Sequence, residues 1–274
     1  MTSWSEPVTY IDWITVGLLL QLEVAYLAAI GPLRGRIVYA DVVKADWRRA
    51  VVFTLGVLTI FLADGTMLRP LSERYLFSAH MSEHLLLTTV AMPLLIIGTP
   101  DWLWRWMLQH PLIEAVMRFC TRPIMALVLF NATLALWHLP LFWELALRHE
   151  NVHLLQHVMY MVTAVFMWWP VLSRVPELPP LSHPLQILYL FIQSLLPGTI
   201  SAVLTFSDTP IYPTYATAER IVPLTPLADQ QIAGLIMKSV GTVVLWLLAT
   251  IIFFVWASRD SRDDARTPRE KVAP

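Results

Sequence analysis

Histidines recur along this chain at a spacing that suits metal chelation. His80 and His84 in AHMSEH lie four residues apart, and His153 and His157 in VHLLQH repeat that spacing. Residues i and i+4 share one face of a helix, so each pair presents two imidazoles side by side. Imidazole nitrogen binds copper, zinc, iron and nickel, and two rings on one helical face can chelate one ion. The two pairs therefore predict a metal site.

Further ligands are available close by in the sequence. His138 in WHLP ends one apolar run shortly before the run that carries the second pair, and it is a fifth expected ligand. His149 continues the four-residue spacing backwards but falls in the intervening loop, so its part is left open. Met81 and Met159 offer sulfur to Cu(I), although packing is the commoner role of a methionine at a helix mouth. The single cysteine, Cys120, leaves no CxxC metal motif.

The elements that must position these side chains are membrane helices. Hydrophobic residues make up 57% of the 274-residue chain and charged residues only 14%, whereas about a quarter of the residues are charged in soluble domains. Crossing a bilayer takes about 20 apolar residues in a helix. The expected spans are residues 10–30, 50–68, 78–98, 121–140, 152–172, 184–206 and 227–257. The sequence predicts an all-α, seven-helix membrane domain over residues 1–257 and a short charged tail over 258–274, expected to be disordered.

Basic residues between the spans give an orientation. The odd-numbered loops and the tail carry 14 Lys and Arg, whereas the amino terminus and the even-numbered loops carry 4. The positive-inside rule then places the amino terminus outside and the carboxyl terminus inside. This orientation puts the five expected ligands on the outer side, with His110 and His183 on the inner side. Because the count uses no histidine, the agreement supports a built site.

Charged residues near the site are expected to support it. Asp64 and Glu83 are expected to orient an imidazole rather than to bind the ion directly. Lys238 lies about 18 Å along the last apolar run from Pro226. An unpaired ammonium is costly at that depth, so Lys238 is expected to face the bundle and pair with Glu83 or Asp64. The alternative is a lysine satisfied by helix carbonyls and water.

Two segments outside the spans have expected positions. The stretch PDWLWRWMLQHPLIEAVMRF after Gly98 is too polar to span and is expected to lie in the cytoplasmic interface, where indoles prefer to sit. The proline-rich stretch Ser207 to Leu224 is expected to cover the metal site. The alternative is a loop that packs beside the bundle. Pro93 is expected to kink its helix.

The motifs AHMSEH, PDWLWR, FNATLALWHLPLFWE, VHLLQH and MWWPVLS together resemble those of the CtaG-type cytochrome c oxidase assembly factors of bacteria. The resemblance covers roughly residues 45 to 257. It implies a seven-helix protein of the bacterial inner membrane that takes part in haem–copper oxidase biogenesis, through copper. By motif it carries over to His80, His138 and His153.

The leading hypothesis is therefore a non-enzymatic assembly factor that holds copper on the outer side for a subunit of a haem–copper oxidase. Zinc and haem are less favoured cofactors. The expected partners are that subunit and membrane lipid, a homo-oligomer is left open, and the net charge of −1 gives no sign of a nucleic-acid partner.

Three other functions are weighed against this one. A haem-binding electron carrier needs axial histidines that face each other across a bundle, whereas the i, i+4 pairs resemble chelation. A metal transporter needs polar groups along its whole path, and the inner half offers little beyond Glu23. A zinc protease is disfavoured because HMSEH lacks a glutamate directly after its first histidine.

Overall fold

The structure, a computed structural model, describes residues 10–37 and 46–266, with side chains to residue 259. Every regular element in these residues is helical, and none is a strand. The elements are α1 Trp13–Ile30, α2 Arg34–Ile37, α3 Trp47–Asp64, α4 Leu68–Arg74, α5 Phe77–Leu85, the π-helical turn η2 Leu86–Ala91, α6 Met92–Gly98, α7 Asp101–Met107, α8 Pro111–Cys120, α9 Pro123–His138, α10 Pro140–Arg148, α11 Glu150–Leu172, α12 His183–Phe206, α13 Pro213–Thr217 and α14 Pro226–Arg266.

The helices confirm a multi-pass membrane protein. Five runs of helix are long and apolar enough to cross a membrane, and the number rises to seven if two bent pairs each count as one span. The first bent pair joins α3 to α4 at 43°, and the second joins α8 to α9 at 83°. The steep second bend agrees with the expectation that the tryptophan-rich segment before residue 121 does not run along the bundle. The seven-span count itself stays a prediction.

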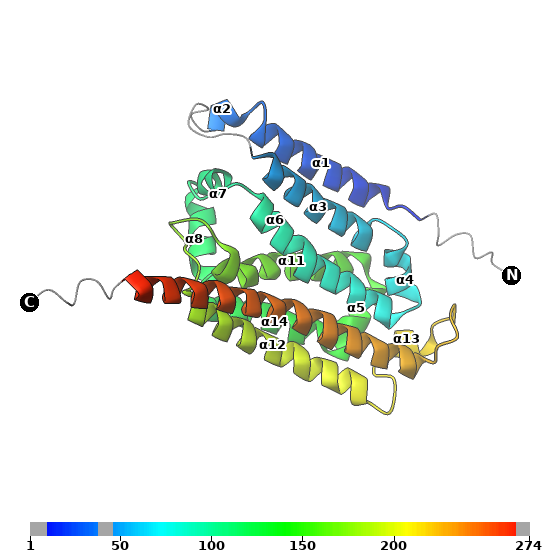
Figure 1. Cartoon of the computed structure of the whole chain (residues 1–274). Helices are drawn as coiled ribbons and strands as arrows, with labels where there is room; N and C mark the ends of the chain where they lie inside the picture. Colours follow the sequence, from blue (N-terminus) through cyan, green and yellow to red (C-terminus); the bar gives the residue numbers. More distant parts are fainter. Residues whose placement is uncertain (1–9, 38–45, 267–274) are drawn as a thin grey trace, which may run out of the picture.

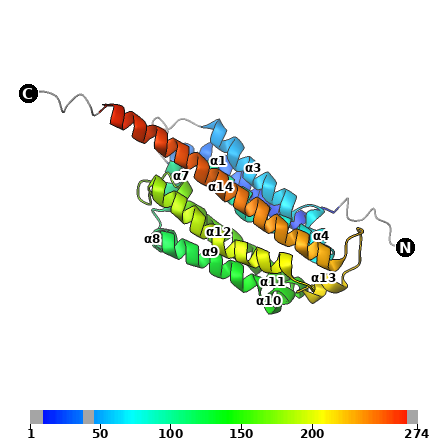
Figure 2. The ribbon, with the colours of Figure 1, turned by 60° about the horizontal axis from the view of Figure 1, so that its bottom comes forward.

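The long helices lie side by side, and the short elements gather at the two ends (Figure 1). One end carries α4, α10 and α13, and the other carries α7 and α8; Figure 2 shows the same grouping from a second direction. Helices α5, α9 and α11 each have one terminus at the first end. The histidine-bearing termini of these three helices are therefore neighbours, as the sequence predicts.

The chain turns π-helical between the first histidine pair and Pro93. Proline cannot donate a backbone hydrogen bond and crowds the preceding turn, and the π turn η2 lies directly before it. Trp168 of α11 donates its indole N–H to the Thr88 carbonyl within this turn at 2.8 Å. This buried bond joins the two helices that carry the histidine pairs. Residues 77–98 continue as one candidate span.

Two expectations about the chain's path are wrong. The stretch after His138 forms helix α10 and not a loop, because Pro140 occupies the first helical turn, where its missing N–H is not needed. The tail is not irregular from residue 258, because α14 continues to Arg266 across the expected boundary. No glycine or proline interrupts the sequence between Trp256 and Pro268, so nothing in it breaks the helix there.

Candidate metal centre

Two histidine pairs face each other across the interface between α5 and α11. We call the four rings of His80, His84, His153 and His157 the histidine box. Within each helix the two ring centroids lie 4.3 Å apart. Across the interface the His84 and His157 centroids lie 5.2 Å apart, and those of His80 and His153 lie 5.9 Å apart. All four side chains are buried, with 1–6% of their surface exposed.

The tautomer of His80 is fixed by a tyrosine from the covering segment. The Tyr215 hydroxyl donates to the Ser72 carbonyl at 2.5 Å and lies 3.1 Å from His80 Nδ1. Since its one proton goes to the carbonyl, the hydroxyl oxygen accepts the Nδ1 proton of His80. Burial raises the pKa of Tyr215 well above its ordinary value, so the hydroxyl keeps its proton. The Nε2 lone pair of His80 is left free for a ligand.

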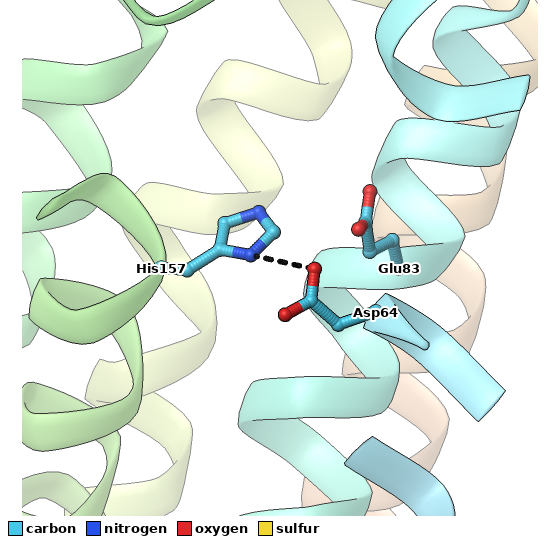
Figure 3. Close-up of side chains that lie close together, drawn as sticks. All are labelled: Asp64, Glu83 and His157. Atoms are coloured by element: carbon cyan, nitrogen blue, oxygen red, sulfur yellow. Dashed lines mark ion pairs between the residues drawn. The ribbon is translucent and has the colours of Figure 1, made fainter. Parts of the chain in front are cut away.

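Carboxylates fix the two histidines of α11 in the same way. Glu73 Oε1 lies 3.3 Å from His153 Nδ1, and Asp64 Oδ1 lies 3.6 Å from His157 Nδ1. A carboxylate can only accept, so each contact favours the tautomer with the proton on Nδ1, which leaves the lone pair on Nε2. Figure 3 shows the His157 ring facing Asp64, with Glu83 beside this pair. A carboxylate on the far nitrogen is the usual support of a metal-binding imidazole.

The nitrogens that face the box have no partner in the described part of the chain. Nε2 of His80, His153 and His157 is buried without a hydrogen bond, and so are both ring nitrogens of His84. Buried polar groups normally have hydrogen-bond partners. Four imidazoles that share this exception, with ring centroids 4.3–5.9 Å apart, are a candidate donor set for a metal ion.

Glu83 and Gln156 add oxygen donors to the box. Both side chains are fully buried, and neither oxygen of Glu83 nor the amide of Gln156 has a hydrogen-bond partner in the described residues. One Glu83 oxygen lies within 4.8 Å of ligand atoms of Asp64 and His157. Of the residues that the structure describes, these three form the one group of three or more whose ligand atoms are that close. Glu83 is thus close enough to Asp64 and His157 to share an ion with them, and the orienting role that the sequence suggests stays a prediction.

An arginine braces the carboxylates from outside the box. Arg69 of α4 is ion-paired to Asp12 and lies 2.9 Å from Glu73 and 3.9 Å from Asp64. Its side chain is only 14% exposed. The same two carboxylates face His153 and His157, so Arg69 fixes one face of the box through them. The 43° turn from α3 into α4 brings Arg69 back over Asp64.

The box lies between two cavities. A polar pocket of about 340 Å³ is lined by Arg69, Glu73, Arg148, Glu150 and His153 among others, and it is at the end of the bundle that carries α4 and α10. A smaller, largely apolar cavity of about 70 Å³ lies deeper and is lined by His84, His138 and Tyr160 among others. The polar pocket is a route to His153, whereas the deeper cavity adjoins His84.

The chain is similar to known proteins over most of its length. The family of cytochrome c oxidase caa3 assembly factors matches residues 24–259, which include the whole histidine box and Tyr215. The chain belongs to this family. It is also similar to the uncharacterized proteins Mb0105 of Mycobacterium bovis and MT0111 of Mycobacterium tuberculosis, each 22% identical over 271 residues. The alignments cover 90% of this chain and 39% of each relative, so the chain spans about two fifths of their length. No solved structure matches it.

His138 of this assembly factor does not join the box directly. Its Nδ1 donates to the Leu134 carbonyl at 2.7 Å, and its buried Nε2 has no partner among the described residues. The ring contacts Trp143 at 5.5 Å between centroids, and Trp143 in turn contacts His80 at 4.5 Å. The indole of Trp143 thus packs against both His80 and His138, and the convergence of His80, His138 and His153 on one ion stays a prediction. His138 remains a fifth buried imidazole beside the box.

Lys238 is not where the sequence placed it. The residue is exposed on α14, while Asp64 pairs with Arg69 and Glu83 has no ion pair among the described residues. The buried face of this part of α14 is formed by Ala233 and Met237. Lys238 follows Met237 by one position, about 100° around the helix, and so points off that face. The expected pairing with Glu83 or Asp64 is wrong.

The segment Ser207 to Leu224 lies against the histidine box. It forms α13, and Tyr215 from this helix reaches His80. Tyr212 just before it donates to the His138 carbonyl at 2.9 Å. His149, whose part was left open, is exposed and lies between α10 and α11, outside the box.

The sequence did not lead us to predict Gln156, Glu73 or Tyr215 as residues near the box. For Gln156, the sequence contains a pattern that predicts its position. His80–His84 reads H-x-x-E-H and His153–His157 reads H-x-x-Q-H, so Gln156 occupies the position that Glu83 has in the first pair. Glu73 and Tyr215 carry no such signal, because they reach the box only through the turns that hold α4 and α13.

Proposed function

We propose that this caa3 oxidase assembly factor binds copper in the histidine box and supplies it to a haem–copper oxidase subunit during assembly. One observation carries the proposal: four buried imidazoles from two helices lie with ring centroids 4.3–5.9 Å apart, and each has a buried nitrogen without a partner among the described residues. Imidazole suits copper well, and outer-shell carboxylates strengthen such ligands. The same donors would also hold zinc, so the identity of the metal is determined by the metal analysis described below.

Haem fits this site less well. A macrocycle between axial ligands needs a pocket of several hundred Å³, in the range of about 300–1,000 Å³ for ligands of that size. The cavity beside His84 and His138 measures about 70 Å³. The close 4.3 Å spacing of the rings within each helix likewise favours a chelated ion.

The proposed setting is the bacterial inner membrane with the box on the outer side. Counting each bent pair as a span gives seven crossings, and an odd number puts the two termini on opposite sides. This agrees with Figure 1, where α1 begins at the end of α4 and α13 while α14 ends near α7 and α8. The excess of basic residues belongs to that second end, which the positive-inside rule assigns to the cytoplasm.

The assembly role is one of holding and transfer, with no catalysed reaction. The polar pocket beside His153 supplies the route by which an ion enters or leaves. The arginines and glutamates that line this pocket present both positive and negative charges to a partner subunit. Lipid surrounds the apolar helix faces, and the proposal needs no second copy of the chain.

Metal analysis of protein purified without a histidine tag tests the proposal. We expect copper in the wild type and in a His110→Ala, His183→Ala control, because both residues belong to the opposite end of the bundle. A variant with all four box histidines replaced by alanine should contain none. Retention of copper by this variant, or a Soret band in the purified wild type, would contradict the proposal. Loss of oxidase assembly in cells that carry only the box variant would connect the metal to the function.

A further inference from the structure

We infer that the histidine box holds two metal ions, bridged by Glu83. This inference rests on the proposed function, because it concerns the same site. The box consists of two rungs across the interface of α5 and α11. The outer rung is His80 with His153, and the inner rung is His84 with His157.

The two helices supply the same pattern of residues. Each contributes a histidine, a fully buried Glu or Gln three residues later, and a second histidine directly after it. Each rung also has a carboxylate of its own on the α11 histidine, since Glu73 faces His153 at 3.3 Å and Asp64 faces His157 at 3.6 Å. A ligand set that repeats after one helical turn provides two equivalent positions.

The number of unsatisfied donors exceeds what one ion can use. Seven buried ligand atoms that face this interface have no partner among the described residues: Nε2 of His80, His84, His153 and His157, both oxygens of Glu83, and Oε1 of Gln156. A copper or zinc ion of the usual tetrahedral kind takes about four ligands. One ion would leave roughly three of these atoms buried and unpaired, at a cost of about one lost hydrogen bond each. Two ions that share a carboxylate use them all.

Glu83 is the residue placed to bridge. It follows His80 by three positions and directly precedes His84, so it lies between the rungs on α5. One oxygen is already within 4.8 Å of ligand atoms from Asp64 and His157 on the inner-rung side, and its second oxygen is also free. Two-metal sites hold their ions about 3.5–4 Å apart, and the ring centroids of the two rungs are separated by 4.3 Å on each helix. Side-chain rotation toward the shared carboxylate closes this difference.

The test is a metal count on rung variants of the full chain. Metal-free, tag-free protein is loaded with copper(II), freed of excess ion, and analysed for copper per chain. We expect two ions in the wild type. We expect one in the outer-rung variant His80→Ala, His153→Ala and one in the inner-rung variant His84→Ala, His157→Ala. Electron paramagnetic resonance gives a second measure, because two copper(II) ions at this distance couple magnetically and a single ion does not.

The controls separate this inference from the proposed function. One ion in the wild type, with an uncoupled spectrum, would overturn the two-ion inference and leave the copper function standing. No bound ion would overturn both. His138→Ala should keep two coupled ions; a fall to one would place the second ion in the deeper cavity and refute the rung assignment. Glu83→Gln should lose the coupling while it retains the fold, and unchanged coupling in that variant would contradict the bridge.

Discussion

Replacing Tyr215 by phenylalanine tests whether the covering helix α13 tunes the metal site. The change removes a hydroxyl that donates to the Ser72 carbonyl at 2.5 Å and accepts from His80 Nδ1 at 3.1 Å. Ser72 is fully buried and His80 is 1% exposed, so water does not replace the hydroxyl. Each buried group left without its partner costs about 1–3 kcal/mol in the free energy of unfolding.

The metal affinity should fall as well. Without the hydroxyl, the Nδ1 proton of His80 has no acceptor, and the ring loses the contact that directs Nε2 into the box. Loss of such an outer-shell partner typically costs about 10–100-fold in metal affinity. We expect a loss of this size for Tyr215→Phe, measured by competition with a copper chelator of known affinity in detergent solution.

Tyr212→Phe is the matched control. Its hydroxyl donates to the His138 carbonyl at 2.9 Å and touches no imidazole nitrogen of the box. The variant removes the same atom from the same covering segment, so its stability should fall by about 1–3 kcal/mol while copper affinity stays at the wild-type value. Equal affinities in the two variants, with thermal unfolding showing both folded, would refute the reasoning.

Four further predictions concern Lys238, two glycines and the dependence of stability on pH. Lys238→Met should retain full copper binding because Lys238 is exposed on α14, and a drop in copper per chain would restore the supporting role that the sequence predicts for this lysine. Gly234→Ala should destabilise the protein by about 1–3 kcal/mol, because its Cβ would lie 2.4 Å from Thr205 Oγ1 and 2.9 Å from the Ser201 carbonyl. Gly198→Ala in α12 meets nothing within 4 Å and should be neutral or stabilising by about 0.5–1 kcal/mol, as compared by thermal unfolding in one detergent. The unfolding temperature should fall as pH rises above 10.0, the ordinary pKa of tyrosine. Burial raises the pKa of Tyr215, so the native state keeps a proton that the unfolded chain loses. The Tyr215→Phe variant should show a smaller fall.

Periodicity was sufficient to predict that each of α5 and α11 presents its two histidines on one face. His80 and His84 share a helical face whatever surrounds them, and so do His153 and His157. The prediction that these helix termini lie together followed from the alternating directions in which successive spans cross the membrane. Apolar runs and basic loops determine that direction, and both can be counted in the sequence. The box was therefore accessible without a structure.

The supports of the box depend on turns that periodicity does not encode. Arg69 reaches Asp64 and Glu73 only because α4 bends back from α3 by 43°. The position predicted for Lys238 was wrong for a related reason. The prediction used only the depth of Lys238 along α14, but the direction of its side chain depends on which face of α14 packs against the bundle. Ala233 and Met237 mark that face at a spacing of four, and a lysine one position later lies outside it, with a stem long enough to extend along the surface.

The two rungs of the box differ in their access, and this bears on how an assembly factor releases its metal. His153 of the outer rung lines the polar pocket of about 340 Å³, whereas His84 of the inner rung lines the smaller, largely apolar cavity of about 70 Å³. Charged ions exchange through the polar route, because an apolar cavity offers no ligands in place of water. If both rungs are filled, the outer ion must leave first. A partner that competes for His153 must then displace Glu73, which faces His153, or Arg69, which holds Glu73 in place. Release is thereby coupled to contact at the end of the bundle where α4 lies, and the inner ion is held until that contact is made.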